Sequence, residues 1–102
     1  MVGNQVRVEV KHDEDTMDIF LNKGCFSWLV PESSKVSRLG IIDYCDQSKE
    51  LLSMIKNLGC KVIKHQGGLV PLYNPQQRLS NGKVLLMGDA ATQVKATTFG
   101  GI

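Results

Sequence analysis

The residues best placed to do chemistry lie near the end of the chain, in Gly88-Asp89-Ala90-Ala91, directly after the apolar run 84–87. An apolar run that stops abruptly is typical of a buried strand, and the small residues after it predict a turn into a helix. Gly88 has no Cβ, so backbone or a ligand can approach closely. Asp89 would follow the carboxyl end of the strand, where open α/β sheets bind ligands and where a carboxylate can accept from a sugar hydroxyl. The alternative is that Asp89 simply caps the helix.

These four residues resemble the second flavin-binding motif of FAD-dependent oxidoreductases of the glutathione-reductase/hydroxylase type, in which the Asp holds a ribityl hydroxyl of FAD. The flanking stretches 67–75 and 92–98 are similar to the geranylgeranyl reductase family, closely from residue 67 to the end and loosely over nearly the whole chain. Glycines that follow the motif would let a helix N-terminus approach the flavin's pyrimidine edge. The FAD-binding residues that the resemblance implies are Gly88, Asp89, Ala90, Ala91, Gly100 and Gly101.

The end of the chain departs from the flavoprotein pattern. Ala96 and Phe99 stand where many relatives have Pro and Gly, and Phe99 would narrow the approach to the flavin. Related ring hydroxylases place His directly after Gly-Asp-Ala-Ala. Thr92 occupies that position, which favours the reductase branch over the monooxygenases.

A second motif, Phe26 to Glu32, resembles the aromatic-x-Trp-x-Phe-Pro-Lys motif of geranylgeranyl reductases, on a strand of the sheet that covers the substrate cavity. Val30 stands where the family usually has Phe, and Glu32 where it usually has Lys, so the charge is opposite to the one that the resemblance implies for a contact with a phosphate headgroup. An isoprenoid substrate needs an apolar cavity, because each buried CH₂ contributes about 0.8 kcal/mol. Without the resemblance, Phe26 and Trp28 would be read as core residues of a sheet. The substrate-binding residues implied are Phe26, Trp28, Pro31, Gly68 and Pro71.

The first half of the chain is predicted to form an antiparallel meander. Alternating apolar residues predict strands at 6–10, 17–22, 25–30 and 36–42, with the second strand pairing back on the first. In the third strand, Phe26, Trp28 and Val30 share one face.

A single long helix is predicted from an N-cap at Asp46 to about Leu58, with Gly59 as its stop. Leu51, Ile55 and Leu58 form an apolar stripe at helical spacing, which indicates contact with the core. A return strand is predicted at 60–65, and Pro71 favours an edge position for the segment 69–72. Asn81-Gly82 is typical of a tight hairpin turn.

Composition limits the possible functions. In 102 residues, 42% are hydrophobic and 22% charged, with a net charge of +2, as expected for an ordinary globular domain without a nucleic-acid partner. Cys25, Cys45 and Cys60 are widely spaced, which favours reduced cytosolic thiols over disulfides. Neither His12 nor His65 has a Cys or His at ligand spacing, so no metal site is predicted.

The predicted fold class is α+β: an antiparallel sheet with one main helix, as a fragment of a larger FAD-binding oxidoreductase fold. Residues 1–75 are assigned to the substrate-domain sheet and helix, and 76–102 to the return strand and the start of a helix of the FAD-binding domain. From Val2 onward the sequence is typical of the middle of a domain, and its last residues fall within the region of the second flavin-binding motif. We therefore expect that this is a fragment of a longer protein whose N-terminal part is missing. The G-x-G-x-x-G fingerprint for the FAD pyrophosphate occurs nowhere in the chain and would lie in that part.

By resemblance, the full-length protein would be an FAD-dependent reductase of carbon–carbon double bonds in isoprenoid (geranylgeranyl) lipids or pigments. It would use an external electron donor, in the cytoplasm or peripherally at a membrane. No side chain is assigned as a catalytic acid or base, since the flavin carries the hydride chemistry. The fragment alone is expected neither to hold FAD tightly nor to catalyse. Two alternatives stay open: a flavoprotein monooxygenase or electron-transfer dehydrogenase fragment, and a stand-alone α+β binding module.

Overall fold

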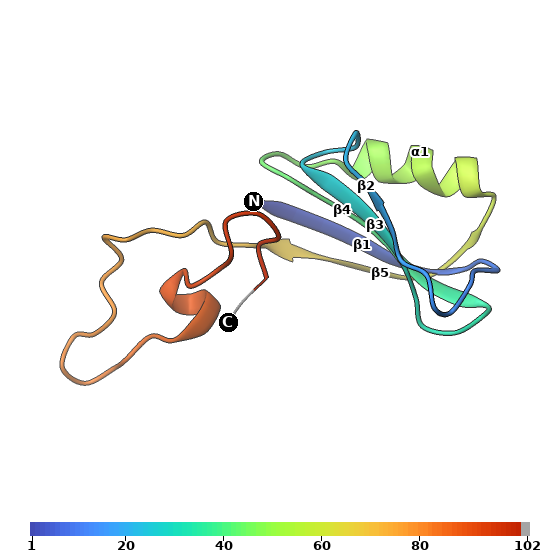
Figure 1. Ribbon diagram of the computed structural model, residues 1–102. Coiled ribbons are helices and arrows are strands. Elements are labelled where there is room, and N and C mark those ends of the chain that lie inside the picture. Colours follow the sequence, from blue (N-terminus) through green and yellow to red (C-terminus); the bar gives the residue numbers. More distant parts are fainter. Residues whose placement is uncertain (101–102) are drawn as a thin grey trace. The chain divides into compact units, whose positions relative to one another are not determined.

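The structure is a computed structural model that describes residues 1–100 of the chain. The chain divides into two compact units: Val2–Gly68, and Met1 together with the residues from Leu69 onward. The first unit contains the strands, apart from Leu69 at the end of the last one, and the one α-helix of the described residues (Figure 1). The elements are β1 (Val2–Glu9), β2 (Asp18–Phe20), β3 (Phe26–Pro31), β4 (Val36–Asp43), α1 (Ser48–Leu58) and β5 (Lys61–Leu69).

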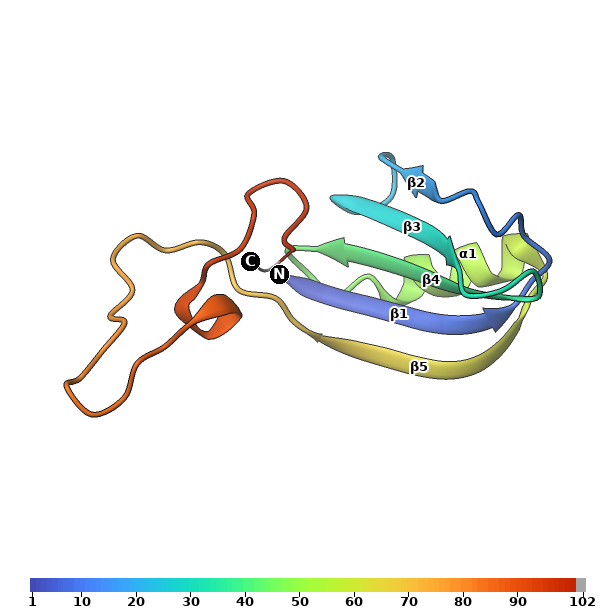
Figure 2. The same cartoon turned by 60° about the horizontal axis from the view of Figure 1, so that its bottom comes forward.

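The five strands form one sheet in the order β2-β3-β4-β1-β5 (Figure 2). The β1–β4, β3–β4 and β2–β3 pairs are antiparallel. The last strand also runs opposite to β1, because Lys61 lies by Glu9 at one end and Gln66 by Gln5 toward the other. The predicted α+β class, an antiparallel sheet with one main helix, is confirmed.

One face of the sheet packs against α1 and forms the core. In the β1–β4 register, Val6 lies opposite Leu39, and both are fully buried. Because strand side chains alternate between faces, every second residue of β1, β3 and β4 reaches this layer. The buried cluster consists of Val6, Val8, Leu29, Leu39, Ile41, Leu51 and Met54.

The predicted pairing of the second strand with the first is wrong. The strand β2 is a three-residue edge strand that pairs with β3, whereas β1 lies between β4 and β5. Its faces are also reversed from the expected pattern, because Phe20 packs on the core while Met17, Ile19 and Leu21 are exposed. A short strand buries little and cannot compete with β4 for the long apolar face of β1.

The helix α1 ends as predicted, with Gly59 in the left-handed conformation at φ 61°. Its N-cap is Gln47 rather than Asp46, although the Asp46 carboxylate accepts from both the backbone N–H and the hydroxyl of Ser48. Leu51 and Met54 are buried, so the contact stripe lies slightly to one side of the predicted Leu51–Ile55–Leu58 line. Helical spacing located the element but not the centre of its buried face.

The second unit holds little regular structure. The Asn81-Gly82 turn is confirmed: Ser80 bridges Leu85, and the Leu86 N–H donates to the Leu79 carbonyl at 2.8 Å. Beyond that bridge, however, residues 83–87 form no strand. The predicted helix after them is a single 3-10 turn, Gly88–Ala91.

The apolar side chains of that segment are not buried: Leu85 is 67% and Met87 74% exposed. A buried strand needs neighbouring strands and a covering layer, and the described residues of this unit supply neither. Among residues 1–100, no helix is long and apolar enough to cross a membrane.

Candidate functional site

The predicted aromatic site lies on the sheet face opposite α1. Ser27 and Leu29 of β3 point into the core, so Phe26, Trp28 and Val30 fall on the other face, as predicted from their alternation. The rings of Phe26 and Trp28 lie 5.6 Å apart between centroids, tilted by 47°. Tilted aromatic pairs at this distance attract each other beyond their area of contact, so the two rings act as one surface.

The indole ring of Trp28 packs against the backbone of β4 at Gly40. The two residues are partners in the β3–β4 register, and a Cβ on Gly40 would lie 2.2 Å from Trp28 Cζ2. Only glycine therefore leaves room for the indole to lie against the backbone of the neighbouring strand. Gly40 was not among the predicted site residues, although an isolated Gly within a strand pattern is a signal of close approach between backbones or to a ligand.

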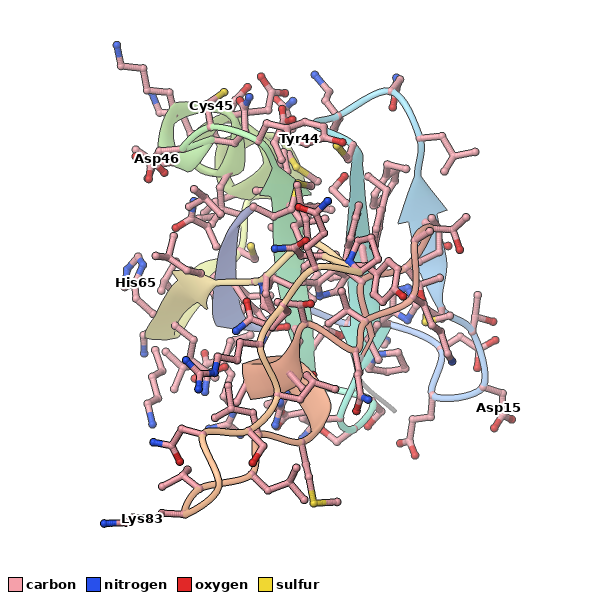
Figure 3. All side chains as sticks on the ribbon, turned by 90° about the vertical axis from the view of Figure 1, so that its left-hand side faces the viewer. Asp15, Tyr44, Cys45, Asp46, His65 and Lys83 are labelled. Atoms are coloured by element: carbon pink, nitrogen blue, oxygen red, sulfur yellow. The ribbon has the colours of Figure 1, made fainter. Side chains whose placement is uncertain are left out.

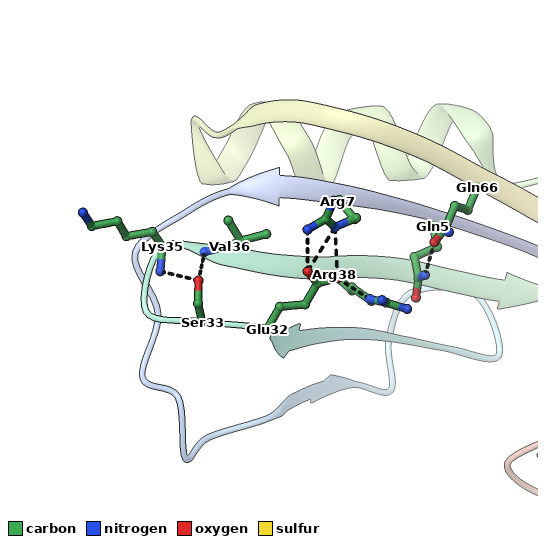
Figure 4. A network of polar contacts seen from close by, with 8 residues as sticks. All are labelled: Gln5, Arg7, Glu32, Ser33, Lys35, Val36, Arg38 and Gln66. Atoms are coloured by element: carbon green, nitrogen blue, oxygen red, sulfur yellow. Dashed lines mark hydrogen bonds and ion pairs between the residues drawn. The ribbon is translucent and has the colours of Figure 1, made fainter.

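Two glutamine side chains continue the site across the sheet. The indole Nε1–H of Trp28 donates to Gln5 Oε1 at 3.0 Å. Figure 4 shows the next bond, in which Gln5 Nε2 donates to Gln66 Oε1 at 2.8 Å. This chain of hydrogen bonds runs from β3 over Gly40 of β4 to β1 and β5. No sequence motif marks Gln5, because its role depends on the strand order.

A charged cluster lies farther along the same face. Arg7 and Arg38 are direct partners in the β1–β4 register, an unfavourable arrangement for like charges. Glu32 accepts from both, with Arg7 Nη2 at 2.7 Å from Glu32 Oε2 (Figure 4). The hydrogen bonds from Arg7, and then from Arg38, lower the pKa of Glu32. The Glu32 carboxylate is thus the counter-ion of two arginines, and the cluster carries one net positive charge.

The other predicted substrate-binding residues do not join the aromatic pair. Pro31 follows Val30, so it falls on the alternate face and pairs with Ser37 of β4. Gly68 lies in β5, three strands away from β3 in the sheet order. Pro71 belongs to the second unit. Their role in binding stays a prediction.

A pocket of about 370 Å³ opens on the first unit between α1 and the strands β1 and β5. Leu51, Ile55 and His65 are among its lining residues, and none of the predicted substrate-binding residues is. Gln5 and Gln66, which continue the aromatic site, also line this pocket, whereas Phe26 and Trp28 lie on the sheet face away from the helix. Within this unit the aromatic face is a surface rather than a cavity.

The predicted flavin motif forms a tight turn in the second unit. Gly88 has a φ of 60°, a conformation that favours glycine, and a Cβ there would meet no atom within 4 Å. The N-cap of the 3-10 turn is Met87, with no side-chain cap, so Asp89 does not cap it. The Asp89 side chain is exposed and makes no hydrogen bond to another described residue, while its carbonyl accepts from the Thr92 N–H. Its carboxylate is therefore free to accept from a ligand.

Side chains that sequence analysis had not assigned hold this turn in place. Gln93 Oε1 accepts from the Gly88 N–H at 3.1 Å, and the Gln93 N–H donates to the Gly88 carbonyl at 3.0 Å. Thr92 Oγ1 accepts from the Asn74 N–H at 3.0 Å. The two stretches that carry the family resemblance, 67–75 and 92–98, thus meet at this hydrogen bond.

The predicted glycines after the motif are only partly described. Lys95 donates its N–H to the Gly100 carbonyl at 2.9 Å and accepts from the Phe99 N–H, so 95–100 is a closed loop rather than a helix. Phe99 has a positive φ of 55°, a conformation that many residues avoid and that Gly would adopt freely. Gly101 lies outside the described residues.

Other polar groups in the first unit have ordinary structural partners. His12 Nε2 lies 2.9 Å from Asp18 Oδ2, a hydrogen bond that raises the pKa of His12. Burial raises the pKa of the Cys25 thiol, and Asp43 adds to that effect. Tyr44, Cys45 and Asp46 lie in the connection from β4 to α1, and Asp15 lies in the turn before β2 (Figure 3). In the described part of the chain, no three His, Cys, Asp or Glu side chains come together as a metal site.

By fold, the first unit is an α+β domain whose antiparallel sheet is covered on one face by a single helix and carries aromatic and polar side chains on the other. The whole chain is similar in structure to part of a geranylgeranyl bacteriochlorophyll reductase-like protein from Thermoplasma acidophilum, with a TM-score of 0.76 and 23% sequence identity. The match covers 98% of this chain and 29% of that protein. The resemblance predicted from the sequence is thereby confirmed at the level of the fold.

The chain spans less than a third of the length of the protein that it resembles. Its sequence matches no protein-family model and no curated protein.

Proposed function

We propose that this chain is part of a flavin-dependent reductase that acts on carbon–carbon double bonds of isoprenoid lipids or pigments. The observation that carries the proposal is the structural likeness, because it spans 98% of the chain and so includes both motifs that resemble geranylgeranyl reductases. The first unit would supply the substrate-facing sheet, and the second unit the turn that holds the FAD ribityl chain.

The residues of the Gly88–Ala91 turn fit this cofactor. Among residues 1–100 the Asp89 carboxylate has no hydrogen-bond partner, as expected of a group that accepts from a ribityl hydroxyl, and the open space at Gly88 admits a close ligand. Gln93 would fix the turn through its two hydrogen bonds to Gly88. FAD, when bound, would supply hydride transfer. Residues that bind its pyrophosphate would come from outside this chain.

The aromatic face of the sheet fits an apolar substrate chain. Phe26 and Trp28 offer a rigid surface, and burial of a long isoprenoid against it would be favourable by about 0.8 kcal/mol for each CH₂ removed from water. To form a cavity, this face needs a cover that the first unit does not contain. The exposed apolar residues at 84–87 likewise need covering, which supports a larger protein around both units.

The test is to express the complete reading frame that encodes this chain and to measure bound flavin by absorbance. We expect stoichiometric FAD in the wild type and a loss of most of it in Asp89→Ala. Asp15→Ala is the matched control, since Asp15 is an exposed carboxylate in a turn. A wild type that purifies and folds without flavin would refute the proposal.

The same material separates the alternatives. Reduction of a geranylgeranyl compound by the dithionite-reduced enzyme under anaerobic conditions supports the reductase, whereas substrate-stimulated oxygen consumption with hydroxylated product identifies a monooxygenase. The natural electron donor and any peripheral association with a membrane are part of the same proposal. Candidate electron donors can be assayed by the anaerobic bleaching of the flavin absorbance, and membrane association by cosedimentation with liposomes that contain the isoprenoid lipid.

A further inference from the structure

Two interactions fix the orientation of the Trp28 indole on the sheet surface. Beneath it, Gly40 leaves the indole in contact with the backbone of β4, where even a methyl group would collide at 2.2 Å. At its edge, the Nε1–H donates to Gln5 Oε1 at 3.0 Å. A tryptophan side chain has two rotatable bonds, so one close surface and one directed hydrogen bond are sufficient to define the plane of its ring.

Gln5 is itself oriented by Gln66. An indole N–H can only donate, so the amide of Gln5 must present its oxygen to Trp28 and its nitrogen to the other side. There Gln66 Oε1 accepts from Gln5 Nε2 at 2.8 Å (Figure 4). The amide is engaged at both ends, and its two bonds link three strands. A glutamine whose only role was to solvate a sheet surface would not need this directional arrangement.

The orientation of Trp28 also determines its contact with the ring of Phe26. Phe26 packs against Trp28 at 5.6 Å, so rotation of the indole would remove the ring contact as well. We propose that Gln5 is a positioning residue that fixes the Trp28 indole, and with it the Phe26–Trp28 surface, for the binding of an isoprenoid chain. This inference rests on the proposed function for its ligand, but the positioning itself can be measured without any ligand.

The first experiment uses this chain as it is, in which Trp28 is the only tryptophan. The indole N–H gives one resolved NMR signal, whose shift and rate of hydrogen exchange report the bond to Gln5. Gln5→Leu removes the acceptor, so we expect an upfield shift and exchange about fivefold faster, the factor that loss of one hydrogen bond implies. Gln5→Glu keeps an acceptor and makes it charged, so we expect a downfield shift. Gln76→Leu replaces an exposed glutamine of the second unit and should change neither quantity.

The second experiment measures the affinity for geranylgeraniol in the complete protein. We expect Gln5→Leu to weaken binding about fivefold and Gln5→Glu to retain it. An indole signal that is the same in wild type and Gln5→Leu would overturn the inference, and Gln5→Glu keeps the test valid should Gln5→Leu fail to fold.

Failure of the proposed function would look different. If the wild type does not bind geranylgeraniol while the indole signal responds as expected, the substrate assignment is wrong and the positioning of Trp28 by Gln5 stands. If the wild type binds and both variants bind equally well despite a changed indole signal, the role of Gln5 in binding is wrong.

Discussion

Two serine hydroxyls illustrate how differently the same group acts in the core and in a turn. Ser27 is fully buried in β3, and its hydroxyl has no hydrogen-bond partner among the described residues. Ser33, in the turn between β3 and β4, accepts from the N–H groups of Lys35 and Val36 at 3.3 and 3.2 Å (Figure 4). A buried hydroxyl without a partner keeps its desolvation cost, whereas a hydroxyl that satisfies turn N–H groups stabilises the fold.

Replacement of these serines should therefore have opposite effects. We expect Ser27→Ala to raise the free energy of unfolding by about 1 kcal/mol, and Ser33→Ala to lower it by a similar amount. Urea denaturation followed by far-ultraviolet circular dichroism measures both. Destabilisation by Ser27→Ala of the same size as that by Ser33→Ala would contradict the absence of a partner for the buried hydroxyl.

At the scale of elements, α1 holds the sheet through a narrow stripe. Leu51 is 5% exposed and belongs to the core cluster, whereas its neighbour Leu52 is 56% exposed. Truncation of a buried leucine removes its transfer free energy and leaves a cavity, so we expect Leu51→Ala to cost about 3 kcal/mol. Leu52→Ala is the matched control, the same change one residue away, and should cost less than about 1 kcal/mol. Comparable losses in thermal or urea unfolding would show that the helix presents a different face to the sheet.

The elements that sequence alone predicted are those in which local pattern and packing agree. The alternation in β1 and β4 and the helical spacing in α1 each describe a face that the fold does bury, whereas in β3 the core takes Ser27 and Leu29 rather than the predicted aromatic face. The apolar pattern at 17–22 predicted the wrong buried face. In a three-residue edge strand, pairing with β3 determines which side chains face the core, and its own apolar residues do not. The apolar run 84–87 also predicted a strand, but local pattern cannot supply the neighbours on which such a strand depends.

The residues of the candidate site also differ in whether local sequence or long-range strand pairing determines their position. Phe26, Trp28 and Asp89 were found from motifs, since each depends on residues adjacent in sequence. Gln5 could not be found in that way, because it meets Trp28 only through the β3-β4-β1 strand order. Long-range register determines such partners, and it is the property that single-sequence reasoning captures least well.

At the scale of the whole molecule, the two units differ in how much of their own core they contain. The unit Val2–Gly68 includes the complete sheet, α1 and the buried cluster. In the second unit, Ala91 and Val94 are buried, whereas Leu69, Leu85 and Met87 are 84%, 67% and 74% exposed. A hairpin and one 3-10 turn with so few buried apolar side chains lack the burial that offsets the entropy of ordering the chain.

We therefore predict that a shortened chain of residues 1–70 folds by itself and unfolds in one cooperative transition. This shortened chain keeps the two backbone bonds between Met1 and Val70, at 2.9 and 3.0 Å. The residues removed bury little, so we expect its urea midpoint to agree with that of the complete chain when both are followed by Trp28 fluorescence. Leu51→Ala in the shortened chain is the control and should lower the midpoint as it does in the complete chain. A shortened chain without a cooperative transition would show that the sheet and helix depend on the residues after Val70.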